Sequence, residues 1–143
     1  MSASLVTGGS GYIALHVIKA LLERDHQVHA TVRSLKSERK CRPLLTLQAA
    51  HPGQLHLFEA DLQKNGSFKE AMTGCSVVYH IASPFLVPQQ IKDGIRDVVE
   101  PAIQGTKNVL DSVNETPTIR RIVLTSSGML PGFPQQVLDE PQS

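Results

Sequence analysis

Val6-Thr7-Gly8-Gly9-Ser10-Gly11-Tyr12-Ile13-Ala14 is a segment in which a short apolar run gives way to helical periodicity. Within it, Gly8, Gly11 and Ala14 stand three residues apart. Glycines at such a junction permit a tight turn and the close approach of a pyrophosphate, and free N–H groups at the start of a helix attract phosphate oxygens. The pattern predicts a dinucleotide site that includes Thr7, Gly8, Ser10, Gly11, Tyr12 and Ile13. The alternative is a tight turn that binds nothing.

The alternation of apolar runs and helical segments continues along the chain. It predicts five strands, at residues 4–7, 27–33, 54–60, 76–82 and 120–126. Between them it predicts helices at about 11–24, 37–50, 67–72 and 98–113. Repeated strand–helix–strand units with right-handed crossovers build a doubly wound parallel sheet. We therefore expect an α/β fold of the Rossmann type, in three layers around about five strands.

Composition limits the classes of function open to the chain. Its 143 residues suffice for one domain, and 41% of them are apolar and 19% charged, with a net charge of +1. This balance gives no reason to expect a nucleic acid or a membrane as partner, and residues 1–10 do not resemble a signal peptide, so we expect a cytoplasmic protein. Cys41 and Cys75 are far apart and the histidines are scattered, which favours free thiols and no metal site.

Positive charge gathers where the second predicted strand ends. The chain reads Thr31-Val32-Arg33-Ser34 at this point, without an acidic residue, and Lys36, Arg39 and Lys40 follow. NAD-binding domains place an acidic residue here for the ribose 2′-hydroxyl, whereas an arginine accommodates the 2′-phosphate of NADP. We therefore predict NADP(H) as the cofactor, with Arg33 and Lys40 among its contacts. The alternative is that these cations form an ordinary solvated surface, and this alternative applies less to Arg33 than to Lys36, Arg39 and Lys40.

Several segments in a fixed order resemble the extended short-chain dehydrogenases/reductases, in particular the group of dihydroflavonol reductase, cinnamoyl-CoA reductase and methylglyoxal (ketone) reductase. Besides the glycine segment and Thr31-Val32-Arg33-Ser34, they are Ala60-Asp61-Leu62, Val78-Tyr79-His80-Ile81-Ala82-Ser83-Pro84, Pro101-Ala102-Ile103-Gln104-Gly105-Thr106-Lys107-Asn108-Val109-Leu110 and Arg121-Ile122-Val123-Leu124-Thr125-Ser126-Ser127. The resemblance covers residues 4–127 and implies a nucleotide-binding domain at 1–127. Glycines and prolines interrupt the regular pattern in a tail at 128–143.

The resemblance also implies roles for single residues. Asp61 and Leu62 would contact the adenine, although Asp61 could instead cap the next helix. The end of the fourth strand would line the ribose and the pyrophosphate with Ile81, Ala82 and Ser83. His80 is more often a satisfied, partly buried strand residue than a catalyst, and Asn108 would steady the sheet or the site through hydrogen bonds.

The two serines at the end of the last predicted strand match the reacting end of the family's site. Ser127 corresponds to the catalytic serine, whose hydroxyl bonds the substrate carbonyl, and Ser126 to a neighbour on the nicotinamide side. The alternative is a pair of serines that satisfy a turn at the end of a strand.

The resemblance stops short of a complete active site. In this family a tyrosine gives a proton to the substrate, helped by a lysine four residues later. The chain has two tyrosines, and at that spacing Tyr12 is followed by His16 and Tyr79 by Ser83. The resemblance therefore implies the cofactor domain of a carbonyl reductase without the substrate-binding part.

Three functions stay open. The first is an NADPH-dependent reductase of aldehydes or ketones that takes its proton donor from a partner. The second is a catalytically silent NADP(H)-binding or regulatory module, and the third is a fragment that folds poorly and binds nothing. Because the fifth predicted strand would have a free edge, we expect a homodimer or pairing with a full-length relative.

Overall fold

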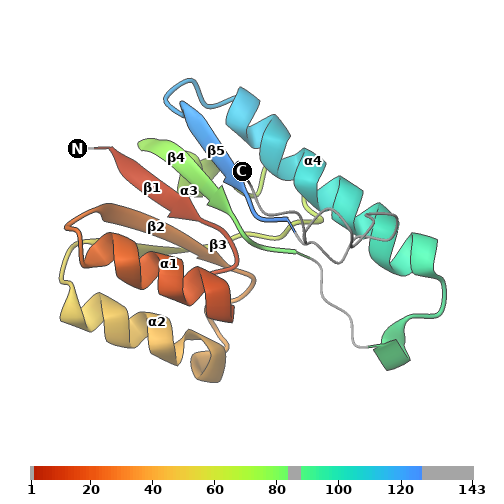
Figure 1. The fold of residues 1–143 in the computed structure, drawn as a ribbon, viewed down its shortest axis with the longest axis horizontal. Coiled ribbons are helices and arrows are strands. Elements are labelled where there is room, and N and C mark those ends of the chain that lie inside the picture. The colour runs from red at the N-terminus through yellow and green to blue at the C-terminus, as the bar shows by residue number, and fades with distance from the viewer. Residues whose placement is uncertain (1, 84–87, 127–143) are drawn as a thin grey trace, which may run out of the picture.

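The computed structural model describes residues 2–83 and 88–126. Within them, five strands form one parallel sheet in the order β3-β2-β1-β4-β5 (Figure 1). The strands are β1 (Ala3–Val6), β2 (Gln27–Val32), β3 (Leu55–Glu59), β4 (Cys75–His80) and β5 (Arg121–Leu124). The helices are α1 (Tyr12–Leu22), α2 (Glu38–Ala50), α3 (Lys69–Met72) and α4 (Glu100–Asn114), with a 3₁₀ turn at Pro88–Gln90 and a π-helical turn at Ile95–Val99. The predicted Rossmann-type fold is confirmed.

The strand order changes its direction of progress across the sheet between β1 and β4, although all five strands run parallel. From β1 the chain moves outward through β2 to β3, and it then crosses back to continue with β4 and β5 on the other side. Val6 at the end of β1 is paired with Ala30 of β2 and with Tyr79 of β4. The loops after β1 and β4 therefore leave the sheet in opposite directions, and such a point is where open α/β sheets bind ligands.

The apolar core is divided between the two faces of the sheet. Helices α1 and α2 cover one apolar cluster, to which Ile18 belongs, and helices α3 and α4 border the other, to which Val109 belongs. The consecutive residues Leu5 and Val6 of β1 are fully buried in different clusters, because successive side chains of a strand point to opposite faces. Burial on both faces explains why β1 reads as a short run of small and apolar residues.

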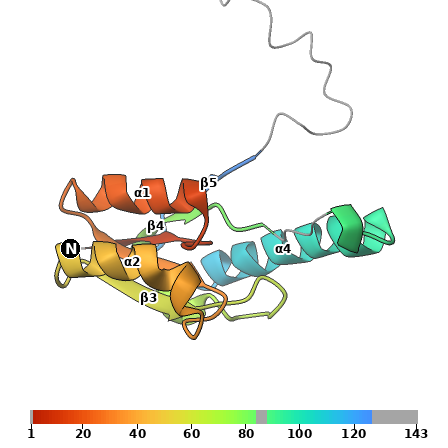
Figure 2. The same ribbon diagram turned by 90° about the horizontal axis from the view of Figure 1, so that it is seen from below.

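Two helices begin differently from the sequence prediction. The regular part of α3 starts at Lys69, because the hydroxyl of Ser67 accepts from the N–H of Asp61 at 3.0 Å and donates to its carbonyl at 2.7 Å. Before α4 the chain forms the π-helical turn, and Pro101, which has no N–H to donate, stands in the first turn of the regular helix. This end of α4 extends beyond the strands (Figure 2).

Candidate cofactor-binding site

The predicted site residues gather at one edge of the sheet, because the carboxyl ends of parallel strands point the same way. They are residues 7–13 after β1, Arg33 after β2, residues 61–62 after β3, residues 81–83 after β4 and Ser126 after β5. The predicted catalytic residue, Ser127, lies outside the described residues. Lys40 joins the group from the first turns of α2.

The glycine turn passes too close to its neighbours for side chains. Gly8 has a φ of +71°, and a Cβ built on it would lie 3.0 Å from the Cα of Ala82. Gly9 donates its N–H to the carbonyl of Thr31 at 2.7 Å, which ties the turn to β2. A Cβ on Gly11 would lie 3.2 Å from the carbonyl oxygen of Gly8. The glycines thus serve the packing of the turn as well as the approach of a ligand.

Helix α1 begins directly at this turn with unsatisfied backbone donors. The first bond of the helix runs from the N–H of Leu15 to the carbonyl of Gly11 at 3.0 Å, so the N–H groups that precede Leu15 have no partner within the helix. The N-cap residue Gly11 brings no side-chain cap, and the first turn holds no acidic residue. Tyr12 is 80% exposed and Ile13 is 55% exposed beside these donors. This helix end is therefore open to an anion.

Thr7 and His80 join the ends of β1 and β4 through buried hydrogen bonds. The hydroxyl of Thr7 lies 2.8 Å from Nδ1 of His80 and accepts from the N–H groups of Ile81 and Ala82, both at 3.0 Å. Thr7 is fully buried and His80 is 4% exposed. Burial lowers the pKa of His80 below its ordinary value, which favours the neutral ring. The prediction of His80 as a satisfied strand residue agrees with this geometry, but its link to Thr7 was not foreseen.

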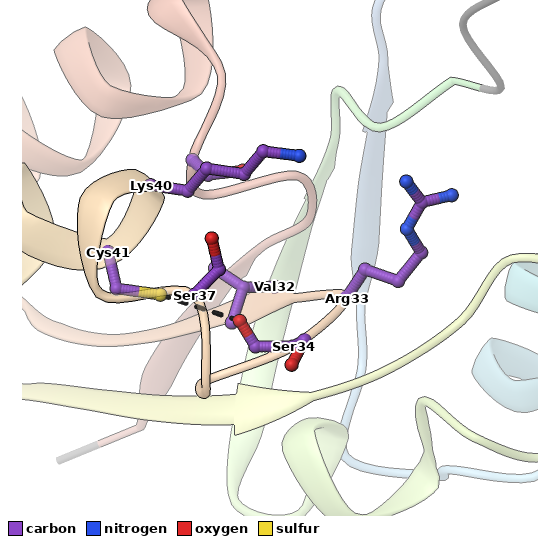
Figure 3. A pocket seen from close by; sticks show the side chains of 7 residues that line it. Val32, Arg33, Ser34, Ser37, Lys40 and Cys41 are labelled. Atoms are coloured by element: carbon purple, nitrogen blue, oxygen red, sulfur yellow. Dashed lines mark hydrogen bonds between the residues drawn. The ribbon is translucent and has the colours of Figure 1, made fainter.

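A hollow of about 120 Å³ lies between the glycine turn, the end of β2 and the start of α2. Arg33 and Lys40 line it together with Ser10, and each of the three is exposed to solvent. Figure 3 shows the side chains of Arg33 and Lys40 extending away from Cys41, the former from the loop after β2 and the latter from α2. Two cations and a hydroxyl at one hollow form a donor set for a phosphate group.

The lining residues Ser34, Ser37 and Cys41 were not among the predicted contacts. A serine that stands just before α2 and follows a strand end is a helix-start signal, and this signal could have pointed to Ser37. The loop that carries Ser34 and Ser37 is held in shape by Glu59 of β3, whose carboxylate accepts from the N–H of Leu35 at 2.9 Å. The neighbouring strand therefore positions the loop on which Arg33 stands.

The turn of Asp61 and Leu62 is held by α4. The carboxylate of Asp61 accepts from the N–H of Gln63 at 2.9 Å, so it closes its own turn, whereas α3 has Phe68 at its N-cap position. Asn108 donates to the carbonyl of Leu62 at 2.7 Å, and its side chain is buried in the helix that covers this turn. The expectation that Asn108 steadies the site through side-chain hydrogen bonds matches this contact.

The exits of β4 and β5 lie side by side. The N–H of Thr125 donates to the carbonyl of His80 at 3.1 Å, which continues the ladder between the two strands beyond β5. Ser126 follows at once and is exposed, as is Ser83 on the exit of β4, whereas Ile81 and Ala82 are half-buried. The structure thus brings Ser126 to the side of the sheet where β4 ends.

Comparisons with known proteins agree with this geometry. The family described as the NAD dependent epimerase/dehydratase family matches residues 4–143. Tetraketide alpha-pyrone reductase 2 of Arabidopsis thaliana is 47% identical over 129 residues, which are 89% of this chain and 39% of that protein. Cinnamoyl-CoA reductase CAD2 of Medicago truncatula is 40% identical over 141 residues, which are 94% of this chain and 42% of that protein. Dihydroflavonol 4-reductase of Solanum lycopersicum is 40% identical over 85% of this chain and 31% of that protein.

Solved structures lead to the same group. The crystal structure of Gre2 from Candida albicans in complex with NADPH is similar with a TM-score of 0.76 and 34% identity, over 89% of this chain and 37% of that one. Vestitone reductase from alfalfa (Medicago sativa L.) has a TM-score of 0.68 and 30% identity, over 90% of this chain and 37% of that one. The chain thus spans well under half of the length of the relatives it matches.

The parallel sheet with its glycine turn defines a dinucleotide-binding α/β protein. The chain belongs to the NAD dependent epimerase/dehydratase family. The predicted resemblance to the dihydroflavonol and cinnamoyl-CoA reductases is confirmed by the relatives above. Across the part of the chain that the structure covers, none of the helices combines the length and the apolar character that a membrane crossing requires.

Proposed function

We propose that the chain is the NADP(H)-binding domain of an oxidoreductase that reduces a carbonyl group to an alcohol by hydride transfer. The observation that carries the proposal is the hollow at the end of β2. Arg33 and Lys40 line it with the hydroxyl-bearing residues Ser10, Ser34 and Ser37. A phosphate monoester such as the 2′-phosphate of NADP suits this donor set, whereas NAD carries only an uncharged hydroxyl at the same position.

The remaining parts of the cofactor fit the other strand ends. The open N-terminus of α1 suits a pyrophosphate, because its first N–H groups have no partner within the helix, and the glycines of the turn beside it add no side chains. Asp61 and Leu62 would border the adenine, and the exit of β4 at residues 81–83 would line the ribose. When bound, the cofactor supplies the hydride, and the reductase names of the relatives support a carbonyl as its acceptor.

One observation favours a second function for this chain by itself. Neither tyrosine of the sequence is followed by lysine at the fourth position, since His16 follows Tyr12 and Ser83 follows Tyr79. A carbonyl that receives a hydride needs a proton donor for the developing alkoxide. We therefore expect the chain alone to bind NADP(H) without turnover, as a silent or regulatory module. A partner that paired along the β5 edge and supplied a tyrosine would restore reduction.

Titration calorimetry of the purified chain with NADPH and with NADH tests the cofactor. We expect NADPH to bind more tightly, because only NADPH presents a phosphate to Arg33 and Lys40. Replacing either cation by alanine removes a charge-assisted hydrogen bond. Arg33→Ala and Lys40→Ala should therefore each lower the affinity for NADPH by about tenfold to a hundredfold and change the affinity for NADH by no more than about twofold. Lys36→Ala is the matched control, since Lys36 is an exposed cation of the same loop but does not line the hollow.

The same samples separate the proposals. Equal affinity for NADPH and NADH, unchanged by Arg33→Ala, would overturn the choice of NADP(H) but keep a dinucleotide site. Failure of the folded chain to bind either cofactor would overturn the binding function. NADPH oxidation with a panel of aldehydes and ketones would overturn the expectation of a silent module, because the proton donor would then lie within this chain.

A further inference from the structure

Thr7 and His80 are the pair of buried polar side chains that join β1 to β4 where the chain reverses direction across the sheet. We propose that His80 is a positioning residue of the nucleotide site, and that it acts by accepting the hydroxyl proton of Thr7. The inference rests on the proposed function, because the turn that it positions is the one assigned to the cofactor. With its ring 4% exposed, His80 acts through Thr7 and not by touching the ligand.

The direction of each hydrogen bond follows from the groups involved. A threonine hydroxyl has one proton to donate and two lone pairs to accept with. The backbone N–H groups of Ile81 and Ala82 can only donate, and both point at Oγ1 of Thr7 at 3.0 Å. Both lone pairs are then used, so the hydroxyl donates its proton to Nδ1 of His80 at 2.8 Å. His80 is therefore held as the neutral tautomer that carries its proton on Nε2.

This assignment gives His80 a task that an apolar residue of equal size cannot perform. With no acceptor in the place of Nδ1, the buried hydroxyl of Thr7 would keep a proton without a partner, which is unfavourable. The hydroxyl would rotate toward another acceptor and give up one of its two N–H partners. The residue that loses its bond would be Ile81 or Ala82, at the exit of β4.

The exit of β4 shapes the glycine turn. Ala82 lies so close to Gly8 that a Cβ on the glycine would be 3.1 Å from the Cβ of Ala82. The N–H of Thr7 donates to the carbonyl of Tyr79 at 3.1 Å, so the backbones of β1 and β4 are already joined just before the turn and the exit begin. Thr7 adds the two bonds that fix Ala82 relative to Gly8. A shift of Ala82 therefore moves the wall against which the nucleotide turn rests.

Substitutions at His80 test the role of Nδ1 directly. His80→Asn places an amide oxygen near the position of Nδ1, whereas His80→Gln places its amide near Nε2, and His80→Phe has no acceptor. We expect NADPH affinity to stay within about threefold in His80→Asn and to fall by about tenfold in His80→Gln and His80→Phe, the effect of one or two hydrogen bonds. Thr7→Ser keeps the hydroxyl and should resemble the native chain, while Thr7→Val should lose affinity.

A double substitution tests whether His80 acts through Thr7. Once Thr7→Val has removed the hydroxyl, His80→Phe should cause no further loss of affinity. Losses that multiply in the double variant would overturn the proposal, because His80 would then act independently of Thr7. Retention of full affinity in both His80→Gln and His80→Phe would overturn it as well.

Hydrogen exchange of single amides provides a readout without any cofactor. We expect the amides of Ile81 and Ala82 to be protected in the native chain and in His80→Asn, and one of them to exchange at least about tenfold faster in His80→Phe. Imidazole ¹⁵N shifts should show Nδ1 as the unprotonated nitrogen. If the native chain binds no nucleotide, the proposed function fails while these measurements still decide the role of His80. Equal protection in His80→Phe, or a proton on Nδ1, would overturn it.

Discussion

Gly8 and Ala82, which belong to loops on opposite sides of the reversal in the sheet, are in such close contact that a Cβ on Gly8 would lie 3.0 Å from the Cα of Ala82. Gly8→Ala therefore combines two unfavourable effects, a left-handed backbone and a clash with a neighbouring backbone. Gly53 offers a matched control, because its φ is +75° and nothing lies within 4 Å of a Cβ built there.

We expect Gly53→Ala to lower the free energy of unfolding by about 1–2 kcal/mol, the cost of the left-handed conformation alone. Gly8→Ala should lower it by at least about 1 kcal/mol more, since packed interiors yield little to an added methyl. Gly8→Ala should also weaken the binding of NADPH, whereas Gly53→Ala should not. Urea unfolding and calorimetry measure both effects, and equal losses in the two variants would contradict the close contact.

Truncation of two buried polar residues of α4 should affect the stability of the chain differently. Asn108, 1% exposed, donates to the carbonyl of the half-buried Leu62 at 2.7 Å, so Asn108→Ala leaves that carbonyl without this donor. We expect it to lower the free energy of unfolding by about 1–3 kcal/mol. Ser112 is also 1% exposed, and its hydroxyl has no partner among the described residues. Ser112→Ala should leave stability within about 0.5 kcal/mol or raise it.

Urea unfolding measures the stability of both variants, and each serves as a control for the other because both change one side chain of the same helix. The two variants should also differ in cofactor binding. Asn108→Ala frees the turn of Asp61 and Leu62 and should weaken the binding of NADPH, whereas Ser112→Ala should not. A loss of stability in Ser112→Ala as large as that in Asn108→Ala would show that the serine hydroxyl has a partner.

Acid should destabilise the chain in part through His80. Burial holds the pKa of His80 in the folded chain below its ordinary value of 6.5. The unfolded chain then binds a proton more readily, so the contribution of the neutral ring is complete above about pH 6.5 and is lost as the pH falls toward the lowered pKa. Urea unfolding between pH 7.5 and pH 5 should show this loss, and His80→Asn should reduce it. Parallel curves for the two proteins would contradict the prediction.

Cys75 should be a poorly reactive thiol. Burial raises its pKa to about 11, which leaves very little thiolate near neutral pH. In a Cys41→Ser variant, where Cys75 is the remaining cysteine, we expect iodoacetamide to react with the native chain at least about a hundredfold more slowly than with the urea-unfolded chain. Mass spectrometry of timed samples measures the two rates. Similar rates would show that Cys75 reaches solvent in the folded state.

The sequence predicted the fold because its signals are local. Apolar runs and helical spacing located the strands within one or two residues, and the glycine turn marked the point where β1 passes into α1. The starts of α3 and α4 differ from the prediction by two residues, at places where a side chain competes with the backbone, as Ser67 does before α3, or where Pro101 withholds an N–H.

The site was predicted as a set of positions, and its contacts were not. Strand ends are visible in a sequence, so Arg33 and Asp61 could be assigned to the ligand edge. The pairing of Thr7 with His80 joins residues 73 positions apart, and the contact of Asn108 with Leu62 joins residues 46 apart. No local pattern encodes such distances, because the crossing of the chain between β3 and β4 creates them. Ser34, Ser37 and Cys41 were missed for a different reason, since their hollow exists only once α2 packs against the sheet, although the helix-start signal could have pointed to Ser37.

The division of the core has a consequence for synthesis on the ribosome. The buried members of one cluster come from residues 6 to 55, from Val6 through Leu55, whereas the other cluster draws on residues as late as Val109. The nascent chain can therefore complete its first core before α4 has been translated. Until β4 emerges, one side of β1 has no hydrogen-bonding neighbour, and Leu5 faces a layer that has not yet been made. The growing polypeptide thus passes through a stage in which one face of the sheet is covered by helices and the other is exposed to solvent. At this stage it is most accessible to chaperones and most prone to aggregation.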